Sequence, residues 1–273
     1  MKLKLTAVRD LSASTREFDF SCDAGAKLSF SAGQFYRFVF TDDAGEFERS
    51  YSICNFDASV SSGIMTPQLV ISQVANGRAT RLLFGDKAGL PGLEARVTGP
   101  FGRLTLPEKL PPRIFLVATS VGIAPYMPIL AALEPALAAG DTEVILMFGI
   151  RDQSEFLYQN HLTRLAREFD NFRLHVCSSR EQLPVTEAVH RHHGYVQEAV
   201  KSYVPTAETG LWYLCGNPSM IDEVYAMLKQ AGLGVRHVIR EKYVFAKQVA
   251  SKSAGPTAEQ KKLIAEKLKK FQS

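Results

Sequence analysis

Residues 49–52 read Arg-Ser-Tyr-Ser and combine side chains suited to a ligand with both phosphates and a planar ring. An arginine is always charged and forms paired hydrogen bonds with phosphate oxygens, so Arg49 suits a pyrophosphate. Alternation along a strand places Tyr51 on the same face as Arg49, where its ring can stack on a planar ligand. Ser52 faces the other way unless the strand bends. Alone, such a tetrapeptide is also typical of an ordinary exposed strand.

A second motif in the same half strengthens the interpretation. Residues 77–80 read Gly-Arg-Ala-Thr after an apolar stretch. Gly77 permits a tight turn, and Thr80 can offer its hydroxyl and amide at the start of a helix, where anions bind readily. Gly-Gln-Phe (33–35) opens a strand upstream, and Thr-Gly-Pro-Phe-Gly (98–102) closes the region.

Two loops in the second half could hold another ligand with phosphates. Residues 118–125 read Ala-Thr-Ser-Val-Gly-Ile-Ala-Pro between an apolar strand and a helix. The backbone amides of such a turn of small residues suit phosphates. Residues 215–220 read Cys-Gly-Asn-Pro-Ser-Met, where a strand ends and a helix begins at Pro218. Either loop alone fits any strand–turn–helix unit, and a free cysteine is usually a buried thiol.

The elements that position these motifs divide into two kinds. The 273 residues are enough for about two domains, and a hydrophobic fraction of 46% fits a globular protein. In the first 108 residues, short strands between turn residues predict an antiparallel barrel or sandwich. Beyond residues 106–112, apolar strands alternate with amphipathic helices and predict a parallel sheet with crossovers. The predicted strands are 2–9, 34–41, 49–54, 69–74, 94–98, 113–118, 143–149, 172–177 and 211–215, and the predicted helices are 125–137, 154–169 and the segment from Cys215 to about Ala231.

Charge and cysteine spacing exclude several classes of protein. The net charge of +4 comes from residues 246–273, which contain seven Lys and two Glu, so a uniformly basic nucleic-acid-binding surface is not expected. The four scattered cysteines do not fit an iron–sulfur cluster or a zinc site. His-Arg-His-His (190–193) lacks further ligands, and we interpret it as an exposed polar loop; no metal site is expected.

Neither a membrane span nor secretion is expected. The apolar segment 114–140 is interrupted by proline and polar residues, which favours a buried strand, a turn and a helix. The N-terminal residues lack the apolar core of a signal peptide, so we expect reduced thiols and a cytoplasmic protein.

The basic tail has a pattern of its own. Residues 251–256 predict a linker, and Leu263, Ile264, Leu268 and Phe271 lie on one face of a predicted helix surrounded by lysines. Such a helix packs on its own protein, or it docks an acidic protein partner, another subunit or a membrane surface.

Together, the motifs resemble the ferredoxin–NADP reductase superfamily, especially its bacterial ferredoxin/flavodoxin reductase branch. The family's flavin motif, Arg-x-Tyr-Ser/Thr followed by Gly-x-x-Ser/Thr, stands at 49–52 and 77–80. The resemblance implies an antiparallel six-stranded flavin-binding barrel over 1–108, a Rossmann-like nucleotide-binding domain with a parallel sheet over 109–246, and a basic linker and helix over 247–273. It implies bound FAD, with Tyr51 stacked on the isoalloxazine ring and Arg49 and Thr80 on the pyrophosphate. The implied FAD contacts are Arg49, Ser50, Tyr51, Ser52, Ile71, Gly77, Arg78, Ala79, Thr80, Thr119 and Tyr243.

The second half resembles the family at Gly-Ile-Ala-Pro (122–125), Ser-Arg-Glu (179–181) and 215–220, although Ala118 and Ser120 replace family glycines. In the family, Ser-Arg-Glu clamps the 2′-phosphate of NADPH, whereas NAD sites often place a carboxylate on the ribose. Gly194-Tyr195 stands where relatives carry Gly-Arg, leaving Arg191 or His192 as substitutes. The implied NADP(H) contacts are Gly122, Pro125, Arg151, Ser179, Arg180, Gly216, Asn217 and Met220.

The resemblance also implies the reaction. Ser52, Cys215 and Glu241 become the catalytic groups around flavin N5 and nicotinamide C4, and Tyr243 covers the flavin until nicotinamide displaces it. We expect an FAD-dependent oxidoreductase that moves hydride between NADPH and flavin, and single electrons to or from ferredoxin or flavodoxin. Two alternatives stay open: an NADH-dependent reductase component of an oxygenase or other complex, and a non-catalytic flavin- or nucleotide-binding regulatory subunit.

Overall fold

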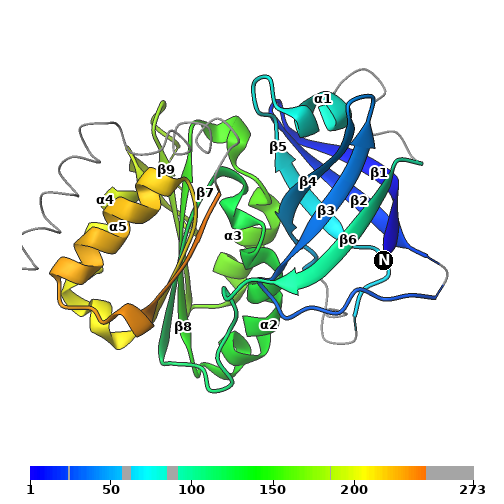
Figure 1. Cartoon of the computed structure of the whole chain (residues 1–273). Helices are drawn as coiled ribbons and strands as arrows, with labels where there is room; N and C mark the ends of the chain where they lie inside the picture. Colours follow the sequence, from blue (N-terminus) through cyan, green and yellow to red (C-terminus); the bar gives the residue numbers. More distant parts are fainter. Residues whose placement is uncertain (24, 57–62, 85–91, 185, 244–273) are drawn as a thin grey trace, which may run out of the picture. The chain divides into compact units, whose positions relative to one another are not determined.

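The computed structural model describes residues 1–23, 25–56, 63–84, 92–184 and 186–243. Two six-stranded sheets organise this part of the chain (Figure 1). Residues 1–243 form one compact unit, and the domain limits predicted at residues 108 and 246 stay predictions. The predicted linker and C-terminal helix lie outside the described residues.

The first sheet is antiparallel, with the strand order β4-β3-β6-β1-β2-β5. Its elements are β1 (Lys2–Ser12), β2 (Thr15–Cys22), β3 (Phe35–Asp42), β4 (Gly45–Ser52), β5 (Gln68–Ser72), the short helix α1 (Arg78–Phe84) and β6 (Glu94–Phe101). Alternate residues of β3 face inward, so that Phe38 and Phe40 are fully buried, and Phe38 contacts Phe20 of β2. The predicted antiparallel flavin-barrel fold is confirmed.

Strand β2 was not predicted from the sequence. Both of its faces are buried, because Phe18 and Phe20 point into the barrel while Glu17 and Asp19 are also largely covered. Buried carboxylates break the alternation of apolar and polar residues that marks a half-buried strand. The pairing of these carboxylates with Arg9 on β1 explains how they are accommodated.

The second sheet is parallel, with the strand order β10-β9-β8-β7-β11-β12. Its strands are β7 (Arg113–Thr119), β8 (Glu143–Ile150), β9 (Phe172–Ser178), β10 (His190–His193), β11 (Leu211–Gly216) and β12 (Val238–Lys242). The connecting helices are η2 (Ser120–Ile123), α2 (Tyr126–Ala139), η3 (Gln153–Glu155), α3 (Gln159–Glu168), α4 (Val196–Lys201), η4 (Val204–Thr209), α5 (Pro218–Gln230) and η5 (Val235–His237).

Helices cover both faces of this sheet (Figure 1). Alternate residues of β7 separate the two layers: Ile114 packs in one core cluster with side chains of α2 and α3, and Phe115 packs in another with side chains of α4 and α5. The predicted parallel sheet with crossover helices is confirmed.

The stretch Ser120–Ala139 is long and apolar enough to cross a membrane by length and composition alone. In the structure it forms η2 and α2, and 67% of its most apolar window is buried inside the protein. Gly140 ends α2 with a left-handed backbone, φ 76°, which suits glycine. The predicted order of buried strand, turn and helix is confirmed here.

Two predicted elements differ from the structure. The helix predicted from Ser154 begins only at Gln159, because Tyr158 has a left-handed backbone, φ 55°, that interrupts it. His-Arg-His-His was wrongly interpreted as a loop, since it forms β10 at the edge of the parallel sheet. An edge strand pairs on one side only and tolerates polar side chains, so its sequence resembles that of a loop.

Candidate functional site

The Arg-Ser-Tyr-Ser motif forms the end of β4, as predicted. Tyr51 lies edge-on to the rings of Phe38 and Phe40, with centroid separations of 5.8 and 6.4 Å. Arg49 bonds only the backbone oxygen of Glu48, at 2.7 Å, and its guanidinium lies 5.4 Å from the Phe47 ring centroid. No carboxylate among the described residues pairs with Arg49, so its charge is available for an anionic ligand.

The Gly-Arg-Ala-Thr motif lies at the start of α1, beside the β3–β4 hairpin. The backbone amide of Val74 donates to the Thr80 hydroxyl at 2.9 Å, which closes the turn at Gly77. Arg78 forms two hydrogen bonds with Asp42, at 2.6 and 2.8 Å, and holds the pKa of that carboxyl down at about 2. Arg78 therefore ties α1 to the hairpin, a structural contact that sequence reasoning did not foresee. The other predicted flavin contacts here are the exposed Ser50 and the buried Ile71 and Ala79.

Four side chains from three separate segments of the chain meet at the end of β4; we call Ser52, Cys215, Glu241 and Tyr243 the Ser52 cluster. The hydroxyl oxygens of Ser52 and Tyr243 are 2.7 Å apart, and the Ser52 hydroxyl donates to Glu241 at 3.3 Å. Cys215 lies opposite Glu241 in the parallel pair β11–β12 and is hydrogen-bonded to the Tyr243 hydroxyl. The cluster joins the first sheet to the second and brings together the three predicted catalytic residues.

Burial dominates the electrostatics of the Ser52 cluster. It raises the pKa of the Cys215 thiol and of the Tyr243 phenol well above their ordinary values, so both stay neutral near pH 7. Burial also raises the pKa of Glu241 to about 7, although the hydrogen bond from Ser52 lowers it. Glu241 is therefore half-protonated near neutral pH and can take up or release a proton there.

Glycines hold the two loops of the second sheet together. A Cβ on Gly122 would lie 2.4 Å from the backbone oxygen of Cys215, and a Cβ on Gly216 would lie 2.5 Å from the Thr119 hydroxyl oxygen. That hydroxyl also accepts a 3.0 Å hydrogen bond from the Asn217 amide. No larger residue fits at either glycine, so Thr119 and Cys215 are positioned by contact between the loops.

These loops lie where ligands bind in parallel sheets. The chain leaves β7 toward β8 on one side and returns to β11 on the other, so the strand order reverses between β7 and β11. Ligands bind at the carboxyl ends of strands beside such a switch point. At this edge, Pro125 precedes α2, Asn217 caps α5 by accepting from the Ser219 amide at 2.8 Å, and Met220 is buried.

The predicted phosphate-binding arginines follow β8 and β9; we call residues 151–155 and 179–181 the arginine loops. The amide of Arg180 donates to the backbone oxygen of Arg151 at 2.9 Å, which joins the two loops. Arg151 pairs with Glu155 at 2.9 Å and also donates to the Ser14 hydroxyl at 3.0 Å. Arg180 is exposed, and no carboxylate in the described ranges pairs with it.

Further hydrogen bonds form within the arginine loops and between them and β10. The Glu181 carboxylate accepts from the Gln153 amide, and the Ser179 hydroxyl lies 3.4 Å from the backbone oxygen of Ile150. Arg191 on β10 donates to the Gln153 side chain at 3.1 Å, and its buried Nε has no hydrogen-bond partner. Arg191 thus lies next to the arginine loops, whereas the ring of His192 turns to His175, 2.9 Å away.

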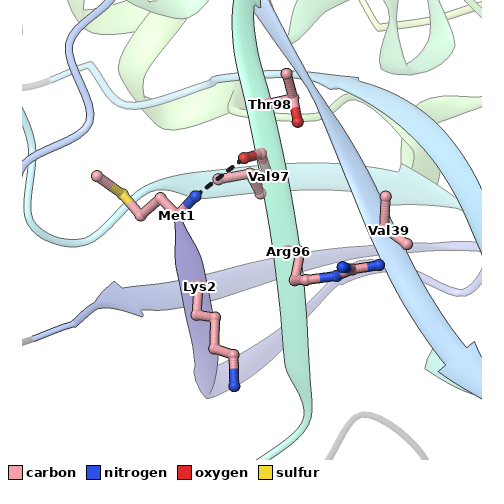
Figure 2. A pocket seen from close by; sticks show the side chains of 6 residues that line it. All are labelled: Met1, Lys2, Val39, Arg96, Val97 and Thr98. Carbon is pink, nitrogen blue, oxygen red and sulfur yellow. Dashed lines mark hydrogen bonds between the residues drawn. The ribbon is translucent and has the colours of Figure 1, made fainter.

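We also searched for a metal site and for cavities. In the described ranges, no three His, Cys, Asp or Glu side chains are arranged to hold a metal ion. A cavity of about 400 Å³ opens at the start of β1 and is lined by residues of β3 and β6 as well. Figure 2 shows the N-terminal nitrogen there, 3.3 Å from the backbone oxygen of Val97. The cavity contains none of the predicted site residues: it is lined by Met1, Lys2, Val39, Arg96, Val97 and Thr98.

Each half of the chain matches a known family of oxidoreductase domains. Residues 2–106 match the model of an oxidoreductase FAD-binding domain, and residues 116–225 match that of an oxidoreductase NAD-binding domain. The chain is 30% identical over 251 residues to ferredoxin–NADP reductase B of Sorangium cellulosum, covering 88% of this chain and 96% of that protein.

Other relatives act in oxygenase systems by name. The chain is 28% identical over 224 residues to the ferredoxin–NAD(+) reductase component of an alkene monooxygenase system from Xanthobacter autotrophicus, covering 81% of this chain and 64% of that relative, less than two thirds. Among solved structures, the Amycolatopsis cytochrome P450 reductase GcoB superposes with a TM-score of 0.75 at 25% identity, over 89% of this chain and 69% of that one.

Proposed function

This chain belongs to the ferredoxin–NADP reductase superfamily, and we propose that it transfers hydride from NADPH to FAD and then single electrons to a small redox protein. It is an oxidoreductase with FAD-binding and NAD(P)-binding regions, so a non-catalytic regulatory role is not retained. The acceptor we propose is a ferredoxin or flavodoxin, because several relatives are named as ferredoxin reductases.

The Ser52 cluster is the observation that carries this proposal. It joins the two halves at the switch point of the nucleotide-binding sheet, beside a strand that ends in Arg-Ser-Tyr-Ser. Hydride transfer requires the two reacting rings to meet at a distance of about 3–3.5 Å. A cluster built from both halves is where a flavin from one and a nicotinamide from the other would meet.

The residues present fit FAD. Within the described ranges the Arg49 guanidinium has no carboxylate partner, and the first turn of α1 offers backbone amides near Thr80. These groups would hold the pyrophosphate, while Tyr51 and Ser52 would bind the ring, with Thr119 and Tyr243 covering it from the second half. Arg78 would contribute through the position of the hairpin, since Asp42 neutralises its charge.

Bound FAD would supply the hydride-accepting atom N5 and the ability to give up electrons one at a time. The protein's residues would orient the rings and manage protons. Glu241 holds a proton on about half of the molecules near pH 7, and Ser52 links it to Tyr243. Cys215 stays a neutral thiol and would form a compact wall for the nicotinamide. Glu241 is the proposed proton reservoir of the site.

NADPH is the proposed donor because of the arginines. A 2′-phosphate requires positive charge, and Arg180 follows β9 with a guanidinium that pairs with no carboxylate in the described part of the chain, with Ser179 beside it. Arg191 lies next to the loop, and its partly buried charge has no carboxylate partner among the described residues. Both cations would favour the phosphorylated dinucleotide.

Stopped-flow reduction of the purified flavoprotein by NADPH and by NADH tests the proposal. We expect rapid bleaching of flavin absorbance by NADPH and slower bleaching by NADH. A protein that purifies with FAD and is reduced by neither nucleotide would contradict hydride transfer. Reduction of an added ferredoxin and flavodoxin, measured separately in the same assay, identifies the acceptor.

Replacing Glu241 by Gln tests the proton reservoir. Removal of a group that supplies protons lowers turnover by about 10²-fold or more, while binding of NADPH is little affected because the amide fills the same space. We expect kcat with a protein acceptor to fall at least tenfold with KM changed less than threefold. Unchanged kcat across pH 6–8 would remove Glu241 from the proposed chemistry.

One observation favours an NADH-dependent reductase of an oxygenase system as the second candidate. Arg151 is already paired with Glu155, and Glu181 follows Arg180 in the chain; with Asp152, the arginine loops hold three carboxylates against two arginines. A carboxylate near the ribose suits the unphosphorylated dinucleotide. Faster reduction by NADH than by NADPH in the stopped-flow experiment would establish this candidate.

A further inference from the structure

A half-buried tyrosine links the two halves of the molecule away from the Ser52 cluster. The hydroxyl of Tyr158, just before α3, donates to the Glu17 carboxylate on β2 at 2.6 Å. It also lies 3.6 Å from the Cys54 sulfur, and its ring packs edge-on against Phe56, 5.7 Å between centroids. Three residues of the first half thus surround one side chain of the second.

The backbone of Tyr158 is held in an unfavourable conformation. Its φ of 55° and ψ of 26° lie in the left-handed region, which is unfavourable for a residue other than glycine. Such a conformation persists only where the surroundings determine it, and it recurs at functional sites. Here it interrupts the helix and turns the phenol toward Glu17.

The acceptor of this hydrogen bond is itself fixed. Glu17 and Asp19 are 5% and 9% exposed, and both bind the guanidinium of Arg9, with the Arg9 Nε 3.0 Å from Glu17. Hydrogen bonds to a charged partner are shorter and about twice as strong as neutral ones. The Tyr158 hydroxyl therefore has a rigid, charged partner on the barrel.

The same segment of the second half touches the barrel at a second point. Glu155 accepts from the Ser14 hydroxyl at 2.8 Å, and Arg151 donates to that hydroxyl. Residues 151–158 thus contact both Ser14 in the β1–β2 turn and Glu17 in β2. The segment begins where β8 ends, next to Thr119 at the end of β7.

We propose that Tyr158 is a positioning residue for hydride transfer: its bond to Glu17 fixes residues 151–158 on the barrel and so sets how closely the nucleotide approaches the flavin. This inference rests on the proposed function. A misplacement of about 1 Å can lower a transfer rate by about 100-fold. Tyr158 touches no predicted ligand contact of the flavin, so it acts through the placement of the second half.

The test compares the holoprotein with its Tyr158→Phe variant, which keeps the ring contact with Phe56. In stopped-flow reduction by saturating NADPH, we expect a 10- to 100-fold slower step and a weaker long-wavelength charge-transfer absorbance between nicotinamide and flavin. FAD content and reduction by dithionite should match the wild type. Without nucleotide, amide hydrogens of residues 151–162 should exchange faster in the variant.

Tyr203→Phe is the matched control. Tyr203→Phe likewise removes one phenol hydroxyl, which is bonded to His175 at 2.8 Å and to Arg173, but both partners lie within the second half, so the variant should be reduced at the wild-type rate. Wild-type protein that NADPH and NADH both fail to reduce contradicts the proposed function. Rapid reduction of wild type and Tyr158→Phe alike, with equal charge-transfer absorbance, overturns the positioning role alone.

A second variant tests whether the effect passes through Glu17. Glu17→Gln keeps an oxygen acceptor and removes the charge, so we expect a smaller slowing than in Tyr158→Phe. If both act through one bond, the double variant is slowed by less than the product of the single effects. Slowing equal to that product would contradict a shared bond.

Discussion

The Ser52 cluster and the arginine loops lie at the carboxyl ends of strands on opposite sides of β7 in the parallel sheet, but they are built differently. In the Ser52 cluster, Ser52 and Cys215 are buried and Glu241 and Tyr243 are half-buried. The cluster holds one group that titrates near pH 7, and backbone contacts that only glycine permits at residues 122 and 216 position it. The arginine loops are more exposed, and pairing between side chains sets their charge. We conclude that substitutions at the cluster should change chemistry and stability, whereas substitutions at the loops should tune which nucleotide binds.

The largest expected effect is the pH dependence that Glu241 gives to stability. Its pKa is about 7 in the folded protein against an ordinary 4.5. The unfolded chain therefore loses this proton first, so stability is full below pH 4.5, falls as pH rises, and levels off above pH 7. The shift corresponds to about 3 kcal/mol.

Urea unfolding at several pH values measures this effect through the fluorescence of Trp212, the single tryptophan. Glu241→Gln should remove the decline between pH 4.5 and 7, so that at pH 8 the variant is more stable than wild type. If the free energy of unfolding depends on pH in the same way in wild type and Glu241→Gln, the charge of Glu241 does not affect stability. The contrast with the arginine loops would then fail.

The next largest effect concerns the arginine loops and the preference for NADPH over NADH. Arg180→Ala should lower the ratio of kcat/KM for NADPH to that for NADH by about 30-fold, because hydrogen bonds to charged groups contribute about 1.5–3 kcal/mol. Arg167→Ala, at an exposed position in α3, is the control. Equal losses with both nucleotides would assign Arg180 to the shared phosphates or to structure.

A smaller effect concerns Arg151 of the arginine loops, whose charge is paired with Glu155. Glu155→Gln leaves an oxygen for Ser14 but removes the charge that neutralises Arg151. An Arg151 freed of its carboxylate should bind nucleotide phosphates more tightly, lowering KM for NADPH by about threefold; the effect is small because the Arg151 side chain of the pair is half exposed to screening solvent, although Glu155 is buried. A steady-state titration measures it; a KM that rises would show that Glu155 orients Arg151 for binding.

The smallest effect returns to the backbone next to the cluster. Ser120 occupies a family glycine position and has φ 50°. Ser120→Gly relieves the unfavourable backbone conformation, which stabilises the folded protein, but it also gives the unfolded chain more freedom. We therefore expect the free energy of unfolding to stay the same or to rise by less than about 1 kcal/mol. Ser219→Gly in α5, with an ordinary helical backbone, should be destabilising. Equal losses in both variants would show that the backbone at Ser120 carries no strain.

Much of the fold followed from local patterns. The motifs at 49–52, 118–125 and 215–220 predicted strand ends and turns, and these turns were found where expected. Their convergence could be anticipated because residues after parallel strands share one edge of the sheet. The meeting of Ser52 with Glu241 was implied by the family resemblance, since no local pattern relates residues 189 positions apart.

What escaped prediction depends on contacts between distant side chains. The sequence did not indicate that Arg151 pairs with Glu155 and Ser14, or Arg78 with Asp42, so Arg151 was predicted as a free phosphate ligand and Arg78 as a flavin contact. Strand β2 went unrecognised because Arg9, Glu17 and Asp19 satisfy one another's charges only once β1 and β2 pair. Such residues look solvent-exposed until their partners are known.

The position of β12 has a consequence for synthesis of the chain. Glu241 and Tyr243 come from the last described strand and the residue after it, whereas Ser52 is made almost two hundred residues earlier. Because chains fold from the N-terminus as they are made, the barrel can form while the cluster is still incomplete. A nascent chain that has reached only β11 would contain Ser52 and Cys215 without the acid and the phenol. The cluster is thus assembled late in folding, when β12 pairs with β11.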